Sequence, residues 1–393
     1  MITKKHIAIN TALSVTVLII FWLFLDFILF PPLLPKLPPK YLQYLPRETR
    51  ILAQSSKKNL IPRHYIALFG DSNAAGVGDE LLKVISNSGA SFGIHHYLHQ
   101  KTGIDIVNFA EGGSCNILGF VGIPIINLDY LKTTRYKVPD PDNIFLLFYE
   151  GNDLQGNLRT FNVFIAEGYD IQRIEDSNYF AAFCEKIMAD YFGPPQIRGV
   201  SFLERNFIFS QFVVSLGRNL KSNLKSWIKP SKTKTQWATG ETNQAKINGK
   251  IVPLPEYLQA PPVTLTEADM DLALKLLDHS LFMVARRFRA PITLVYIPSV
   301  LNVYQILSPW VSIQNEKSFY SPASVDQRGQ MMRQKIETIC FKHQIHFLDS
   351  SPTLREAAKS TLLHGPQDWR HFNKKGYELL AGFMEPSIKD EAI

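Results

Sequence analysis

Three short apolar segments, each stopping at a polar turn that contains glycine, restrict the possible folds of this chain most strongly. The turns that follow them are Gly70-Asp71-Ser72, Glu111-Gly112-Gly113-Ser114 and Glu150-Gly151-Asn152-Asp153. Nearly continuous apolar segments are typical of strands that a parallel sheet buries on both faces. Open α/β sheets hold their active sites just beyond the carboxyl ends of such strands. The pattern therefore predicts a doubly wound α/β domain whose functional residues follow its strands.

The rest of the chain continues the alternation of strand and helix. The three apolar strands are expected at 65–69, 104–110 and 143–149, and two more at 291–298 and 345–349. Helical spacing of apolar residues is found near 79–85, 92–103, 266–287 and 324–343, and a last helix follows the polar segment 367–375. We expect a flavodoxin-like, five-stranded parallel sheet in a domain that spans residues 64–385.

A long insert, residues 154–262, interrupts this alternation. Within it a basic amphipathic stretch runs from Phe207 to Lys229. Such a stretch suits a helix on an anionic membrane surface, a lid over a site, or an ordinary surface helix packed by its apolar face. The stretch 231–250, rich in Lys, Thr, Asn and Gly, is expected to be an exposed loop.

The N-terminus predicts a transmembrane helix. After a short tail, 1–6, the segment 7–30 is apolar apart from Asn10 and Asp26 and is long enough to cross a bilayer. A proline-rich, basic segment, 31–63, follows where a signal peptide would have small residues for cleavage, which favours an uncleaved signal anchor over a removed signal peptide or a buried core helix. We expect Asp26 to reach the interface, and 31–63 to be a linker that holds the domain off the bilayer.

The charge and cysteine content indicate which binding partners and cofactors to expect. The formal net charge is +7, but the basic residues are dispersed and no nucleic-acid-binding motif is present, so no nucleic-acid partner is expected. Three cysteines lie far apart without metal spacing, and neither a metal nor an organic cofactor is expected. Lysines flank the apolar segment on both sides, so orientation rests on the very short tail and the large following domain, which favour the periplasm or cell exterior.

Residues for nucleophilic catalysis occur at the strand ends and before the last helix. A serine that attacks an ester needs a base, a group that orients the base, and donors for the oxyanion. Ser72 follows the first strand, and Asp368 and His371 lie three residues apart beside the last helix. Taken singly, these residues would suit a turn, a helix N-cap and a solvated surface histidine.

Taken in order, four blocks of the chain resemble the SGNH/GDSL hydrolase superfamily. They are Gly70-Asp71-Ser72, Asn108 with the glycines after it, Gly151-Asn152-Asp153, and Asp368 with His371, and the resemblance covers roughly residues 65–384. It implies that Ser72 is the nucleophile, His371 the general base and Asp368 its orienting partner. It also implies an oxyanion hole formed by the backbone N–H of Ser72, that of Gly113 or Gly112, and the side chain of Asn152. Asn73 stands where the family's name has Leu.

The implied activity is that of a membrane-anchored serine esterase. Its expected partners are the membrane and an acyl ester of a carbohydrate or lipid. Two alternatives remain open: an O-acyltransferase or deacetylase acting on a cell-envelope polysaccharide or lipid, and a catalytically idle, membrane-tethered binding or assembly protein.

Overall fold

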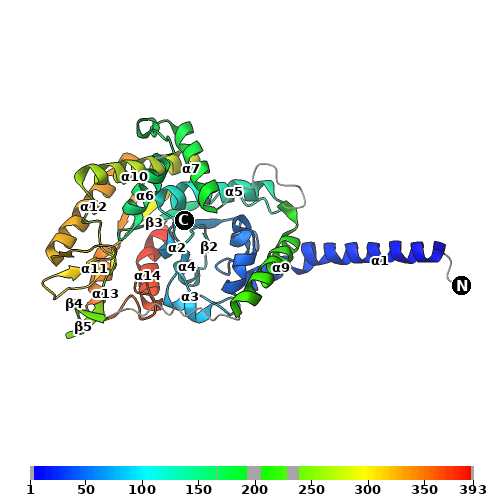
Figure 1. Ribbon diagram of the computed structural model, residues 1–393, viewed down its shortest axis with the longest axis horizontal. Helices are drawn as coiled ribbons and strands as arrows, with labels where there is room; N and C mark the ends of the chain where they lie inside the picture. Colours follow the sequence, from blue (N-terminus) through cyan, green and yellow to red (C-terminus); the bar gives the residue numbers. More distant parts are fainter. Residues whose placement is uncertain (1–3, 166, 193–204, 228–238, 391–393) are drawn as a thin grey trace.

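A five-stranded, all-parallel sheet lies at the centre of the protein (Figure 1). The structure is a computed structural model that describes residues 4–165, 167–192, 205–227 and 239–390. The strands are β1 (Tyr65–Gly70), β2 (Asp105–Asn108), β3 (Asn143–Tyr149), β6 (Ile292–Ile297) and β9 (His346–Asp349), arranged in the order β2-β1-β3-β6-β9. Counted along the chain this is the order 2-1-3-4-5, which is compatible with a flavodoxin-like fold. The predicted parallel sheet is confirmed, and every strand falls on a segment predicted to form one.

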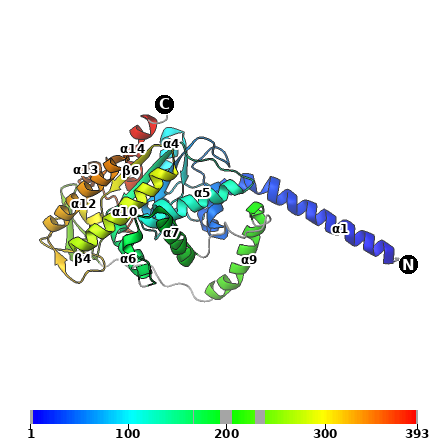
Figure 2. The ribbon, with the colours of Figure 1, turned by 90° about the horizontal axis from the view of Figure 1, so that it is seen from above.

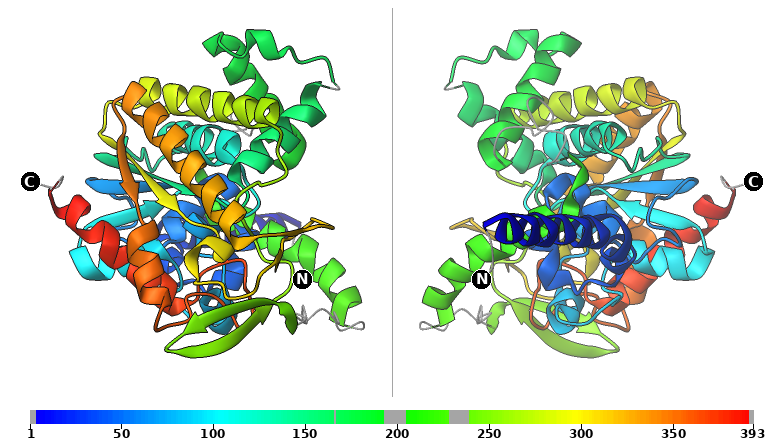
Figure 3. Two further views of the ribbon diagram at one scale, coloured as in Figure 1. Left: turned by 90° about the vertical axis from the view of Figure 1, so that its left-hand side faces the viewer. Right: turned by 90° about the vertical axis from the view of Figure 1, so that its right-hand side faces the viewer.

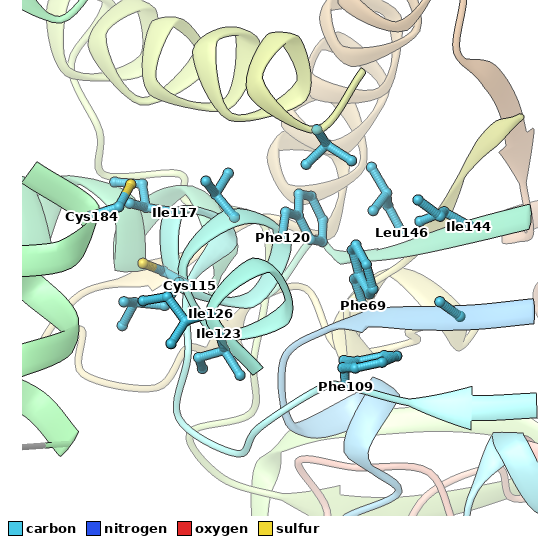
Figure 4. Packing of buried hydrophobic residues seen from close by; sticks show 14 of the residues in the cluster. Phe69, Phe109, Cys115, Ile117, Phe120, Ile123, Ile126, Ile144, Leu146 and Cys184 are labelled. Carbon is cyan, nitrogen blue, oxygen red and sulfur yellow. The ribbon is translucent and has the colours of Figure 1, made fainter. Parts of the chain in front are cut away.

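The sheet is buried on both faces. Successive residues of each strand point to opposite faces, so each strand contributes side chains to two apolar clusters. In β1, Tyr65, Ala67 and Phe69 belong to one apolar cluster, whereas Ile66 and Leu68 belong to the other. Figure 4 shows the first cluster, in which Phe69 and Phe109 lie near Phe120 of the π-helix η5 (Ile117–Gly122). The alternation of side chains across the strands therefore produces two cores.

Helices cover both faces of the sheet and complete three layers (Figure 3). Helices that contribute to the first core are α5 (Ile123–Thr133), α6 (Asp153–Ile165), α7 (Ser177–Phe192) and α10 (Glu267–Arg287). Helices that contribute to the second core are α4 (Ile94–Thr102), α11 (Val300–Val303), α13 (Ser351–Ala358) and α14 (Lys374–Asp390), while α12 (Pro322–Lys342) contributes to both. The short helices α2 (Ser72–Ala75) and α3 (Asp79–Val84) lie between β1 and α4 in sequence, and η6 (Ile171–Arg173) lies between α6 and α7.

Two small antiparallel sheets accompany the main one. One pairs β4 (Thr239–Ile247) with β5 (Lys250–Pro255), and the other pairs β7 (Val311–Ser312) with β8 (Phe319–Tyr320). The first corrects the prediction of an exposed loop at 231–250, of which 231–238 lie outside the described residues. Asn248 and Gly249 both have positive φ, 51° and 73°, which suits a two-residue hairpin turn.

One helix of the described chain is long and apolar enough to span a membrane. It comprises α1 (Lys4–Phe24) and continues through the π-helix η1 (Leu25–Leu29). No residue of α1 is buried, and Leu18 is 65% exposed, so the alternative of a buried core helix does not hold. Figure 1 shows α1 projecting away from the rest of the molecule.

The segment after α1 differs from the predicted linker. It forms the 3-10 helices η2 (Pro31–Lys36), η3 (Pro39–Tyr44) and η4 (Arg47–Ala53), and Leu34 and Leu52 are fully buried in the first core. Prolines begin η2 and η3, where a missing N–H costs nothing, and Pro46 immediately precedes η4. The segment after α1 is therefore part of the folded body.

Asp26 also departs from its prediction. Its side chain is fully buried, and its carboxylate accepts hydrogen bonds from the backbone N–H of Phe209 (3.0 Å) and from the N–H and hydroxyl of Ser210 (3.1 and 2.7 Å). Phe209 and Ser210 lie in the first turn of α9 (Ile208–Trp227), whose N–H groups need acceptors. Figures 1 and 2 both show α9 crossing beside the base of α1. Asp26 thus joins the insert to the end of α1 instead of reaching toward the interface.

Candidate active site

Ser72 lies just beyond the carboxyl end of β1 and is the first residue of α2. Asp71 caps this short helix and accepts a hydrogen bond from the N–H of Asn73 (2.8 Å). Gly70 turns the chain with φ +152°, and a Cβ there would lie 2.8 Å from the Cβ of Ala74. Because only glycine fits this turn, Gly70 brings Ser72 close to the edge of the sheet.

The three residues proposed from sequence as nucleophile, base and orienting acid are in contact. Nε2 of His371 lies 2.8 Å from Oγ of Ser72, and Nδ1 of His371 lies 2.6 Å from Oδ2 of Asp368. Ser72 is 8% exposed, and the side chains of His371 and Asp368 are 15% and 17% exposed. Residues 299 positions apart in the chain thus form one hydrogen-bonded row that remains open to solvent at one side.

Electrostatics favours one protonation pattern for this row. Burial by itself would raise the pKa of Asp368, but the hydrogen bond and positive charge of His371 outweigh it and hold that pKa below its ordinary value. An ionised Asp368 can only accept hydrogen bonds, so the proton of the imidazole lies on Nδ1. The lone pair of Nε2 then faces the Ser72 hydroxyl, which is the arrangement a general base requires.

Asp79 holds the segment that carries Asp368, and sequence reasoning missed it. Its carboxylate, fully buried at the start of α3, accepts hydrogen bonds from the N–H of Asp368 (2.6 Å) and of Gln367 (3.1 Å). Gly78 precedes it with φ +149°, and a Cβ there would lie 2.4 Å from the carbonyl oxygen of Phe372. The start of α3 therefore contacts the chain both before His371, at Gln367 and Asp368, and after it, at Phe372. In the sequence, Asp79 is an acid in the first turn of a helix, where acids are common because they favour the helix dipole. Nothing near it in the sequence indicates its distant hydrogen-bond partners.

The glycine turn after β2 borders the serine. A Cβ built on Gly112 would lie 3.9 Å from the Cβ of Ser72, and Gly113 adopts φ +82°. Asn108, the first residue of this block, donates through its side chain to the carbonyl of Ala74 (2.6 Å) and accepts from the N–H of Ala110 (2.9 Å). Asn108 thus ties the turn after β2 to α2, and the choice between Gly112 and Gly113 as donor stays open.

Asn152 lies beside two buried acids. Burial raises the pKa of Asp71, partly offset by hydrogen bonds that include one from the Asn152 side chain. Burial, with the charge of Asp71, raises the pKa of Asp153 well above its ordinary value. Asp153 accepts from the N–H of Tyr149 (2.8 Å) and the amide of Asn116 (2.9 Å), and so connects the turns after β2 and β3.

Glu150 holds the turn that carries Asn152, directly after β3. Its buried carboxylate accepts four hydrogen bonds: from Tyr296 Oη (2.6 Å), the N–H and Oγ of Ser299 (2.8 and 2.6 Å) and Nδ2 of Asn302 (2.8 Å). Burial raises the pKa of Glu150, against the lowering effect of these donors. The network joins the end of β3 to the end of β6, and sequence patterns do not reveal it because its members come from separate segments.

In the part of the chain that the structure describes, no three His, Cys, Asp or Glu side chains lie close enough together to hold a metal ion. Comparison with models of known protein families and with curated proteins found no match in either case.

Proposed function

We propose that this protein is a serine hydrolase of SGNH type that cleaves an acyl ester. The observation that carries the proposal is the row from Ser72 through His371 to Asp368, with contacts of 2.8 and 2.6 Å. This is the geometry in which a hydroxyl becomes a nucleophile, because the base lies within hydrogen-bond reach and is itself oriented by a carboxylate.

In the proposed reaction, Oγ of Ser72 attacks the acyl carbonyl while Nε2 of His371 takes the hydroxyl proton. Asp368 stabilises the imidazolium that forms and keeps the ring in position. Collapse of the tetrahedral intermediate breaks the ester bond, and the leaving alkoxide takes the proton from His371. Water then attacks the acyl-enzyme by the same route and releases the carboxylic acid and free Ser72.

The oxyanion would be stabilised by three donors around Ser72. The Asn152 amide has two N–H groups, so one can donate to Asp71 while the other remains for the oxyanion. The backbone N–H groups of Ser72 and of Gly113 or Gly112 complete the set. Support for this assignment is the closeness of Gly112 to the Ser72 side chain.

Replacement of the nucleophile tests the proposal. The purified full-length Ser72→Ala variant should lose hydrolysis of p-nitrophenyl acetate and labelling by a fluorophosphonate, while its thermal unfolding stays that of the wild type. Ser360→Ala, a change of an exposed hydroxyl that donates to the carbonyl of Ala357 near the end of α13, serves as the matched control. Labelling of the Ser72→Ala variant at the wild-type level would refute the assignment.

The same chemistry serves acyl transfer, so the acceptor needs its own measurement. With a soluble oligosaccharide present, hydrolysis releases free acid, whereas a transferase produces an acylated sugar from the same acyl-enzyme. The ratio of the two products assigns the protein to one activity. A chain that forms neither product and is not labelled at Ser72 would be a tethered binding or assembly protein.

We also propose that the hydrolase is anchored by a single uncleaved membrane span, with the domain outside the cytoplasm. Support comes from the exposed apolar surface of α1 and from the packing of the residues that follow it. Asp26 and Phe30 are buried against the folded body, so cleavage beyond the apolar segment would remove contacts on which the insert depends. Immunoblot of cell membranes for full-length chain, with protease accessibility of the domain in spheroplasts, tests both points.

A further inference from the structure

A groove of about 610 Å³ lies where the insert crosses the end of α1. Its wall includes Trp22 of α1, Tyr44 of η3, and Phe207, Val214 and Arg218 at and within α9. The volume falls within the range of roughly 300–1,000 Å³ typical of small-molecule sites. The wall is mainly apolar and also includes the polar side chains of Ser210, Gln211 and Ser215, and Val214 is 51% exposed.

The position of Trp22 sets the depth of this groove in a membrane. The span Lys4–Leu29 has 26 residues, and at 1.5 Å per residue it is about 39 Å long, longer than the ~30 Å hydrocarbon core. Its last turns therefore lie at the boundary between acyl chains and headgroups, where Trp is common. A groove with Trp22 in its wall opens to lipid, not only to water.

The start of α9 is held at this boundary by several independent contacts. The rings of Phe209 and Trp22 are 5.2 Å apart, those of Phe207 and Phe27 are 5.2 Å apart, and Nε1 of Trp22 donates to Oγ of Ser210 (2.7 Å). Together with the buried carboxylate of Asp26, these contacts fix the first turns of α9 to the last turns of the span. The orientation of the groove relative to the bilayer is thus built into the fold.

Positive charge gathers at the same end of α1. Arg218 lies in the groove. A second cavity, of about 450 Å³, is lined by Phe27 and by Arg135, Lys137 and Arg205. Basic groups beside a membrane span attract anionic lipid headgroups.

We propose that this groove binds one anionic membrane phospholipid, with an acyl chain against Trp22, Phe207 and Val214 and its phosphate beside Arg218. The site rests on the proposed membrane anchoring but not on the proposed chemistry, because none of its residues belongs to the row at Ser72. It gives the insert a role distinct from that of a lid or an ordinary surface helix: α9 holds a lipid at the junction of anchor and domain.

Photolabelling in vesicles tests the site. The full chain is reconstituted in phosphatidylcholine vesicles that contain phosphatidylglycerol with a diazirine at the end of one acyl chain, and the labelled tryptic peptide 206–218 is measured by mass spectrometry. The Val214→Trp substitution fills the groove and should lower labelling about tenfold. The matched control is Val163→Trp in α6, where the original side chain is 48% exposed, and it should label as the wild type does.

Two further comparisons, a second lipid probe and a second variant, test the preference for an anionic headgroup. A phosphatidylcholine probe with the same diazirine should label the peptide about tenfold less than the phosphatidylglycerol probe, and Arg218→Gln should remove that difference. Because this variant lacks the tryptic site at position 218, its labelled peptide is 206–221. Equal labelling of the Val214→Trp and Val163→Trp variants, or equal labelling by the two probes, would overturn the proposal. Failure of the chain to float with the vesicles would refute the anchoring as well, whereas loss of esterase activity in Ser72→Ala leaves the labelling unchanged.

Discussion

The carboxylate of Asp79 offers a sharp test of how the candidate site is held together. It accepts from the N–H of Asp368 (2.6 Å) and of Gln367 (3.1 Å) while fully buried. In Asp79→Asn the amide keeps one acceptor oxygen, but its NH₂ then faces a backbone N–H. One charge-assisted hydrogen bond is lost, which should lower the free energy of unfolding by roughly 1.5–3 kcal/mol.

Activity should fall more than stability alone explains. Asp368 orients His371, and Gly78 packs against the carbonyl of Phe372, so a shift of this segment moves the imidazole away from Ser72. A displacement of about 1 Å costs on the order of 10²-fold in turnover. We expect kcat for p-nitrophenyl acetate to fall by that order with a much smaller change in KM.

The matched control is Glu80→Gln, which removes a charge from the same first turn of α3. Glu80 forms an ion pair with Lys83 at 3.6 Å, and it forms no other ion pair with the residues that the structure describes. The control should retain wild-type kcat and unfolding. Urea unfolding followed by tryptophan fluorescence and steady-state kinetics are measured on all three proteins. If Asp79→Asn matches Glu80→Gln in both measurements, Asp79 does not position the Asp368 segment.

Four other substitutions test separate parts of the structure. Asn152→Ala should lower kcat by about 10²–10³ through loss of one oxyanion donor, with unchanged thermal unfolding, and a fall below tenfold would contradict that role. Glu150→Ala leaves four buried donors without their acceptor, and at about 1–3 kcal/mol for each unsatisfied donor it should lower the free energy of urea unfolding by several kcal/mol. Burial lowers the pKa of His364 from 6.5 to about 3; the unfolded chain therefore binds the proton first, and the stability conferred by the neutral ring, present above pH 6.5, is lost as pH falls toward 3. Between pH 7 and 4.5 this loss is about 2–3 kcal/mol, and His364→Phe should remove it from the measured pH dependence. Asp26→Ala should expose α9 to limited proteolysis, because it removes the acceptor of that helix's first turn; an unchanged cleavage rate would show that the aromatic contacts suffice.

Local patterns were sufficient for the sheet and for the members of the candidate row. Each parallel strand is a short apolar run that ends at a glycine turn, so its position depends on neighbours in sequence. Ser72, Asp368 and His371 were identified from such turns and from their order along the chain. Their hydrogen bonds agree with that identification, while their catalytic roles await the substitutions above.

The errors also have local causes. The polar composition of 231–250 favours a loop, but Asn-Gly between alternating residues is a strong hairpin signal, and it marks the turn at Asn248-Gly249. The prolines of the segment 31–63 favour a linker, but Leu34, Leu45 and Leu52 of this segment pack into the core. Composition outweighed pattern in both cases.

By itself the sequence determined which segments form the strands of the parallel sheet, which helix can span a membrane, and which side chains are candidates for acyl chemistry. These follow from properties of residues close together in the chain: apolar periodicity, turn-forming residues and the types of side chain at strand ends. Only the tertiary structure brought Asp79 to the Asp368 segment, Asp26 to the start of α9, and Trp22 to the wall of a groove. Each of these contacts joins residues far apart in sequence, and their energy arises from burial and from pairing of backbone N–H groups, which no local pattern encodes.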